Sequence, residues 1–109
     1  MTLSTHVLDA VLGRPAADLP VRLDVARPEG WLPVATERTD TDGRIRFATE
    51  LRGGPHRLTF DTAAYFGATG VAHFFYPEVA IAFAVTDPAA HYHVPLLLSP
   101  FAYSTYRGS

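Results

Sequence analysis

The last segment of the sequence carries the residues best suited to chemistry. His91 and His93 stand at alternate positions in HYHVPLLLSP, and the chain stops on the tetrapeptide Tyr-Arg-Gly-Ser at 106–109. A chain end is usually expendable, whereas this one holds an arginine and two hydroxyls. Imidazoles transfer protons near neutral pH, and a guanidinium binds oxygen-rich groups. The combination predicts a polar site for a small, oxygen-rich molecule.

Two further residues with such side chains lie on predicted strands nearer the start of the chain. His6, in STHVLD, shares a strand face with Ser4, and Arg44, in TDTDGRIRF, lies on the face opposite Ile45 and Phe47. Taken alone, each is better interpreted as an ordinary solvent-exposed residue. Arg44 cannot act as a base at neutral pH, but its planar fork can hold a carbonyl or a carboxylate by two hydrogen bonds.

A metal site and a serine hydrolase site are two alternatives for the chemistry of this chain. His91 and His93 could ligate a metal together, because alternate residues of a strand project to the same side. No third ligand stands at motif spacing, so we expect no metal site, although adventitious zinc at this pair stays open. A serine hydrolase is not expected either, because the sequence has no G-x-S-x-G motif. His56 and His73 lie in loop-like contexts and receive no role.

A length of 109 residues allows one domain, which we place at residues 1–109. Hydrophobic residues make up 48% of the chain and aromatic residues 12%. A single sandwich of this size cannot hide so much apolar surface, and we expect part of it to lie in a subunit interface. Without cysteine the chain can form neither a disulfide nor a thiolate zinc site.

Charge and hydropathy exclude two classes of partner. The net charge is −2, and no basic stripe indicates a nucleic-acid surface. No apolar run reaches the length that spans a membrane, and the first residues lack the charged and apolar regions of a signal peptide. We therefore expect a cytoplasmic protein that binds neither nucleic acid nor membrane.

Alternating hydrophobicity predicts the strands that must position these side chains. Residues 20–27 alternate between aliphatic and mostly polar side chains, which is typical of a half-buried strand. Residues 79–86 alternate large apolar side chains with alanines, and we expect another sheet or subunit to approach the alanine face closely. Residues 87–90 form a predicted turn, so we expect 79–86 and 91–98 to pair as a hairpin.

One short helix interrupts the predicted strands. We expect Thr62 to cap it, Ala63 to Phe66 to form it, and Gly67 or Gly70 to end it. Short strands at roughly even spacing, with so little helix, predict an all-β fold built as a two-sheet antiparallel β-sandwich. Further strands are expected at 3–9, 31–38, 44–49 and 56–61.

Several segments together resemble a known family. They are LSTHVLDAVLGRPA at 3–16, TDTDGRIRF at 39–47, FFYPEV at 74–79 and HYHVPLLLSPFAYSTYRGS at 91–109. On these segments the chain resembles the transthyretin-related proteins, and within them the 5-hydroxyisourate hydrolases. Transthyretin itself, the hormone carrier, has lysine in place of His6 and glutamate in place of Arg44, and it lacks the terminal tetrapeptide. These differences favour the hydrolase over the carrier.

The resemblance implies a transthyretin-like sandwich assembled as a homotetramer, a dimer of dimers, with active sites where the dimers meet. It implies that water opens the six-membered ring of 5-hydroxyisourate to 2-oxo-4-hydroxy-4-carboxy-5-ureidoimidazoline, on the route from urate to allantoin. Neither a metal nor an organic cofactor is implied. The resemblance assigns catalysis to His6, Arg44 and His93, and substrate binding to Tyr106, Arg107 and Ser109.

Within such a site we expect His6 and His93 to transfer protons and Arg44 to stabilise an oxyanion. The sequence leaves open which histidine activates water. The alternative is a transthyretin-like protein that binds an aromatic ligand in a central channel without catalysis. A third interpretation, a structural interaction domain joined through its sheet edges, leaves the polar residues unexplained.

Overall fold

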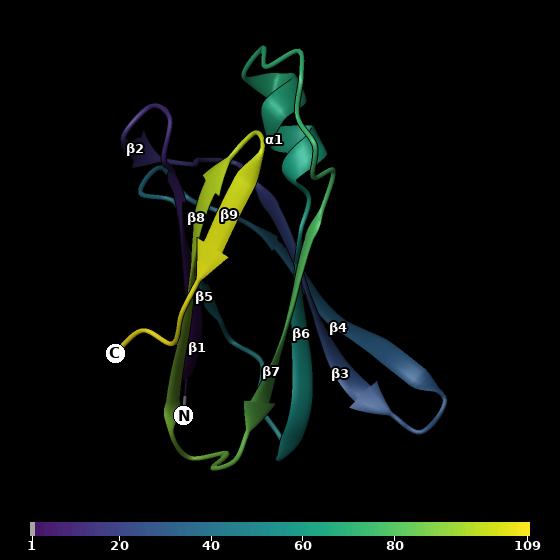
Figure 1. Cartoon of the computed structure of the whole chain (residues 1–109). Helices are drawn as coiled ribbons and strands as arrows, with labels where there is room; N and C mark the ends of the chain where they lie inside the picture. The colour runs from purple at the N-terminus through teal and green to yellow at the C-terminus, as the bar shows by residue number, and fades with distance from the viewer. Residues whose placement is uncertain (1) are drawn as a thin grey trace.

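Two β-sheets pack face to face, and one short helix lies at one end of the sandwich (Figure 1). The computed structural model describes residues 2–109. The elements are β1 (Thr2–Asp9), β2 (Arg14–Pro15), β3 (Pro20–Arg27), β4 (Gly30–Arg38), β5 (Arg44–Phe47), β6 (Gly54–Phe60), α1 (Thr62–Ala68), β7 (Val79–Val85), β8 (His91–Ser99) and β9 (Ala102–Thr105).

The first sheet has the order β2-β1-β8-β9, and β5 pairs with β1 beside β2. The second sheet has the order β4-β3-β6-β7. The predicted all-β sandwich with one short helix is confirmed, with one departure from a purely antiparallel arrangement, because β1 and β8 run parallel. The sequence prediction omitted β2 and β9. All four residues of β9 are exposed, so the strand has no hydrophobic alternation by which to find it.

The predicted hairpin between 79–86 and 91–98 is wrong. Strand β7 pairs with β6, whereas β8 pairs with β1 and β9, so the two strands belong to different sheets. The turn between them exists, with the Ala90 N–H donating to the Asp87 carbonyl (3.0 Å). This turn carries the chain from one sheet to the other. The buried faces of β7 and β8 therefore meet across the core, and the two strands do not pair.

The helix starts one residue earlier than the sequence predicted. Asp61 is its N-cap, and the Asp61 carboxylate accepts a hydrogen bond from the Ala64 N–H (3.0 Å). Thr62 is the first helical residue, and its hydroxyl donates to the Tyr76 carbonyl (2.5 Å). On the next turn Tyr65 donates its hydroxyl to the Asp9 carboxylate (2.7 Å), which ties α1 to the end of β1.

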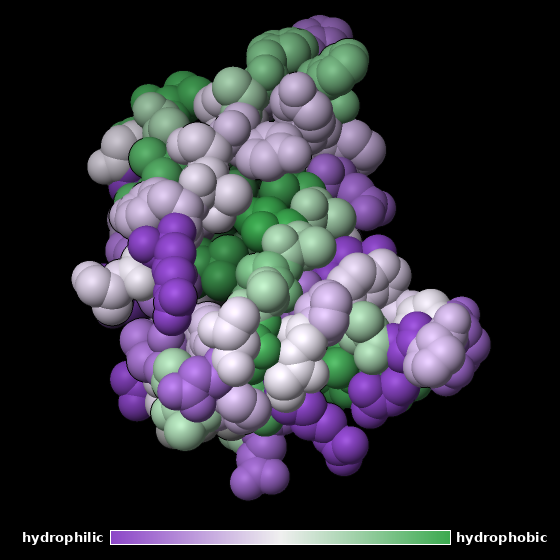
Figure 2. Space-filling view, turned by 60° about the horizontal axis from the view of Figure 1, so that its bottom comes forward, coloured by the Kyte–Doolittle hydropathy of each residue, from purple (hydrophilic) through white to green (hydrophobic). Residues whose placement is uncertain are grey.

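The core lies between the sheets and takes one face of each central strand. The chain nevertheless exposes large apolar side chains, in line with the composition, and Figure 2 shows hydrophobic surface in a hollow near the middle of the molecule. Over the described residues, no helix is long and apolar enough to cross a membrane. The exposed large hydrophobic residues are Val11, Leu12, Trp31, Leu32, Val34, Phe75, Phe101, Tyr103 and Tyr106.

Candidate active site

The pairing of β1 with β5 brings a histidine and an arginine together. In this antiparallel ladder His6 lies opposite Arg44, and Ser4 lies opposite Arg46. Burial alternates along both strands, and these four side chains all point away from the core. Side chains directly opposite on one sheet face have Cβ atoms about 5 Å apart, so His6 and Arg44 are direct neighbours.

A tight turn before β5 sets this register. The Asp40 carboxylate accepts hydrogen bonds from the N–H groups of Asp42 and Arg44, both at 2.9 Å. Gly43 has a φ of 76°, and a Cβ there would lie 2.4 Å from the Val7 carbonyl oxygen. The Val7 N–H in turn donates to the Gly43 carbonyl (2.8 Å). Only glycine lets the turn approach β1 this closely.

The parallel ladder between β1 and β8 adds a second histidine. Ser4 is the register partner of His93, and the Ser4 hydroxyl lies 2.8 Å from Nδ1 of His93. His93 is half-buried on the outward face of β8. The structure thus places His6, Arg44 and His93 on one sheet face, from three neighbouring strands. A shallow pocket of about 250 Å³ opens on this sheet, lined by Ser4, Thr5, Asp40, Arg44, Ile45, Arg46 and His93.

The surroundings of His93 favour its neutral form. Burial lowers the pKa of His93 most, and electrostatic interactions with His6, His91 and Arg44 lower it further. A hydrogen bond with the backbone of Ser4 acts in the opposite direction and is outweighed. A neutral imidazole beside a permanent guanidinium charge can accept a proton from water while the cation stabilises an anion.

The C-terminal tetrapeptide passes directly over His93. The Gly108 N–H donates to the His93 carbonyl (2.8 Å), and the two residues form an isolated β-bridge. A Cβ at position 108 would lie 2.3 Å from Cδ2 of the imidazole. Glycine is therefore the residue that lets the tail lie against the ring. Tyr106 and Ser109, on either side of this contact, are exposed.

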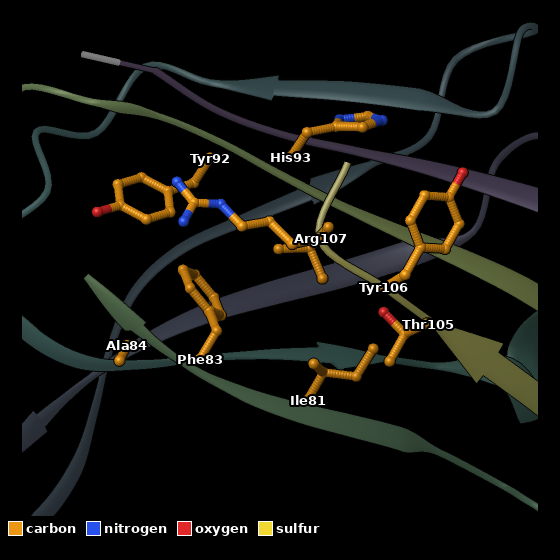
Figure 3. Close-up of a pocket in the computed structure, with 9 residues that line it drawn as sticks. Ile81, Phe83, Ala84, Tyr92, His93, Thr105, Tyr106 and Arg107 are labelled. Carbon is orange, nitrogen blue, oxygen red and sulfur yellow. The ribbon is translucent and has the colours of Figure 1, made fainter. Parts of the chain in front are cut away.

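Arg107 points to the other side of the tail. It lies across a pocket of about 320 Å³ between β7 and the β8–β9 pair (Figure 3). Its Cζ lies 4.8 Å from the ring centroid of Tyr92, which is a cation–π distance. The Tyr92 hydroxyl accepts hydrogen bonds from the N–H groups of Thr86 and Asp87, and these lower the pKa of Tyr92, the Asp87 bond most. Arg107 and Gly108 thus anchor the tail on two sides.

Sequence reasoning left two residues of this arrangement without a role, Ser4 and Tyr92. The alternation along the first strand places Ser4 on the same face as His6, and this is the only sign of Ser4 in the sequence. Its contact with His93 depends on the parallel pairing of two strands far apart in the chain. Tyr92 was assigned to the face opposite His93, and it is indeed buried. Its stacking with Arg107 depends on the path of the tail, which no local pattern predicts.

His91 lies at the edge of this face. Its Nδ1 contacts the Thr2 hydroxyl, and its ring stacks on that of His93 with centroids 6.4 Å apart. Among residues 2–109, no three histidine, cysteine, aspartate or glutamate side chains gather as a metal site.

Comparison with known proteins identifies the family. The family model described as HIUase/Transthyretin family matches residues 3–108. The chain belongs to this family. It is 43% identical to 5-hydroxyisourate hydrolase 2 of Rhizobium meliloti, an alignment that covers 98% of this chain and 95% of that protein.

Solved structures similar to this chain include both a 5-hydroxyisourate hydrolase and a transthyretin in complex with thyroxine. The 5-hydroxyisourate hydrolase of Klebsiella pneumoniae matches with a TM-score of 0.85 and 36% identity, covering 99% of this chain and 93% of that one. Sea bream transthyretin in complex with thyroxine matches with a TM-score of 0.87 and 33% identity, covering 97% and 93%. Because the backbone matches both equally well, the fold does not separate the two activities, and the side chains of the site must.

Proposed function

We propose that this protein is a 5-hydroxyisourate hydrolase, which opens the six-membered ring of 5-hydroxyisourate in urate catabolism. The observation that carries the proposal is the gathering of His6, Arg44 and His93 on one sheet face, in a chain whose full-length relatives carry that enzyme name. The product is 2-oxo-4-hydroxy-4-carboxy-5-ureidoimidazoline.

The reaction requires a base, an oxyanion stabiliser and an acid. A histidine takes a proton from water, and the water oxygen bonds to a ring carbonyl carbon to form a tetrahedral intermediate. The carbon–nitrogen bond then breaks, the carbonyl becomes a carboxyl group, and the ring nitrogen receives a proton. His6 and His93 are the groups proposed for the two proton transfers. Arg44 is proposed to stabilise the negative oxygen, which is typically worth about 3–4 kcal/mol for one well-placed donor.

Substrate positioning is proposed for Tyr106, Arg107 and Ser109. The contact between Gly108 and His93 supports this role, because it keeps the neighbouring tail residues beside the imidazole. Arg107 stacks on Tyr92 in the single chain, so its contribution to binding would be to hold the tail in place or to swing toward the substrate.

A homotetramer, as a dimer of dimers, is part of this proposal. The outward face that carries His6 and His93 is open in the single chain, and a second copy would enclose it. Within residues 2–109, strands β7 and β9 each end a sheet and pair along one edge only. Because β1 and β8 run parallel, the loops that follow them lie at the same end of the sheet, and these loops expose Val11, Leu12 and Phe101. A cytoplasmic location is also proposed, and cell fractionation tests it.

An assay with freshly generated 5-hydroxyisourate tests the proposed hydrolase activity. Urate oxidase generates 5-hydroxyisourate, and its decay is followed spectrally with and without the purified protein. We expect decay well above the spontaneous rate, and about a 100-fold loss or more for His6→Ala, Arg44→Ala and His93→Ala. His73→Ala and Arg38→Ala serve as matched controls, because both side chains are exposed and lie outside this site. An unchanged spontaneous rate with the wild-type protein would refute the proposal.

The carrier remains the second candidate, favoured by the structural match to thyroxine-bound sea bream transthyretin. The names of the relatives, and a polar site face unsuited to an apolar hormone, support the hydrolase instead. Calorimetry with thyroid hormones separates the two, since tight, saturable binding without turnover of 5-hydroxyisourate is expected only of a carrier.

A further inference from the structure

The parallel ladder between β1 and β8 pairs a hydroxyl with an imidazole twice. Thr2 is the register partner of His91, and Ser4 is the register partner of His93. In each pair the hydroxyl contacts Nδ1 of the ring, at 2.8 Å for Ser4 and His93. The same ring nitrogen therefore faces β1 in both histidines, and the ladder fixes which edge of each ring is turned away.

The ring of His93 is restricted on more than one side. Ser4 holds Nδ1, and the Gly108 backbone lies so close to Cδ2 that a Cβ would overlap the ring. Within residues 2–109 no hydrogen bond is made by Nε2 of His93. The imidazole therefore has one engaged nitrogen and one nitrogen available to a ligand.

The nitrogen that contacts Ser4, Nδ1, is the better position for the proton of a neutral His93 ring. A neutral imidazole carries its proton on one nitrogen and a lone pair on the other. The Ser4 hydroxyl oxygen, 2.8 Å from Nδ1, can accept a hydrogen bond from an N–H there, whereas an N–H on Nε2 would find no acceptor within residues 2–109. With the proton on Nδ1, the lone pair lies on Nε2, which is the nitrogen that a base needs.

We propose that Ser4 is a positioning residue for the hydrolysis, which accepts a hydrogen bond from Nδ1–H of His93 and so keeps Nε2 as the proton-accepting nitrogen. This proposal rests on the proposed function and names His93 as the base. Nε2 takes a proton from water as the water oxygen bonds to the ring carbonyl carbon. Nδ1–H keeps its bond to Ser4. His6 gives a proton to the departing ring nitrogen, and a proton then passes from Nε2 of His93 to His6, which restores both rings.

Substitutions at position 4 separate the hydroxyl from the shape of the side chain. Ser4→Ala and Ser4→Val remove the hydroxyl, whereas Ser4→Thr keeps it and matches valine in shape. Thr2 makes the same kind of contact with His91, so threonine at this register is able to reach Nδ1. Thr2→Val is the matched control, because it removes the equivalent hydroxyl from His91, which takes part in neither proton transfer.

Two measurements are made on each variant, steady-state kinetics and the ¹⁵N shifts of the histidine rings. We expect Ser4→Ala and Ser4→Val to lower kcat by about 10- to 100-fold, as for a misplaced catalytic group, with KM changed less than about twofold. Ser4→Thr and Thr2→Val should keep the wild-type kcat. The ¹⁵N shifts should show His93 as the Nδ1–H tautomer in the wild-type protein and Ser4→Thr, and as a tautomer mixture in the other two position-4 variants.

Either of two results would overturn the proposal. One is a kcat within twofold of wild type in both variants that lack the hydroxyl. The other is a wild-type His93 protonated on Nε2. A wild-type protein without any activity would refute the proposed function instead, and the ring shifts would still tell whether Ser4 selects the tautomer. The failure of the one proposal is thus distinguishable from the failure of the other.

Discussion

At the scale of single residues, His93 is the group whose environment is most specific. Burial and electrostatic interactions with His6, His91 and Arg44 disfavour its protonated form, and the pKa is lowered from its ordinary value of 6.5. If neutral His93 is the base, activity is fully present above this lowered pKa and is lost as pH falls through it. The acid limb of kcat/KM, which reports the free enzyme, should therefore lie below pH 6.5, and a rate profile between pH 4.5 and 8 measures it.

The same electrostatics predict the effect of a neighbour. His91 contributes repulsion that lowers the pKa of His93, so His91→Gln should raise that pKa. The acid limb of kcat/KM should then move to higher pH while the plateau above it stays. An ¹⁵N titration of His93 in the same variant checks that the kinetic limb belongs to this ring. A limb that does not move would exclude His93 as the titrating group.

At position 108, only glycine leaves room for the imidazole of His93. In Gly108→Ala the new Cβ would meet Cδ2 of His93 at 2.3 Å, so either the ring or the tail must move. We expect about a tenfold or greater loss of kcat, with a change in unfolding free energy below about 1 kcal/mol, because the tail is peripheral. Gly53→Ala is the control, since its Cβ meets only the Val85 carbonyl at 3.9 Å. Kinetics and thermal unfolding of both variants test this.

At the scale of elements, one buried contact fastens α1 to the sheet that carries the site. The Asp9 carboxylate accepts the Tyr65 hydroxyl through one oxygen, and the N–H groups of Val11 and Leu12 through the other. Burial, and then the bond to Asp9, raise the pKa of Tyr65 to about 12, so the hydroxyl stays protonated at any physiological pH. The contact therefore orders the end of β1 and the loop after it.

Removing that hydroxyl should destabilise the fold. Tyr65→Phe leaves one oxygen of the buried Asp9 carboxylate without its donor, which costs about 1–3 kcal/mol. Tyr103→Phe is the matched control, because Tyr103 is 41% exposed, and we expect it to stay within about 0.5 kcal/mol of wild type. Urea unfolding of the two variants gives the comparison. Equal stabilities would mean that solvent replaces the lost bond.

At the scale of the whole molecule, the site face and the sheet edges are incomplete in one chain. A tetramer should have a mass in solution near four times 11.9 kDa, and its melting temperature should rise with protein concentration. Light scattering and melting curves over a range of concentrations measure both. A monomeric mass with full activity would contradict a site completed by a second copy.

A charge in the exposed loop after β1 tests the interface directly. Leu12 is 52% exposed, and we expect Leu12→Asp to lower both the mass and the activity, because an interface core disfavours a carboxylate. Leu32 is similarly exposed on β4 of the other sheet, and Leu32→Asp serves as its control. If both variants keep the wild-type mass, the loop lies outside the interface.

The sequence alone determined the local half of this structure. Alternating side chains predicted the faces of β1, β5 and β8, and so placed His6, Arg44 and His93 on outward faces. On β3 the pattern misplaced Asp24, which is buried where it binds Arg22 and Arg57. It also predicted the turn at 41–43, since glycine suits a positive φ. These features depend on a few neighbouring residues, and side-chain pattern is enough to specify them.

Only the tertiary structure decided which strands are partners. The split of β7 and β8 between two sheets, the parallel pairing of β1 with β8, and the path of the tail over His93 join residues far apart in the chain. Strand pairing uses backbone groups that every residue shares, so the side-chain pattern of a strand tells its buried face without telling its neighbour. For that reason the contact between Ser4 and His93 follows only from the pairing of β1 with β8.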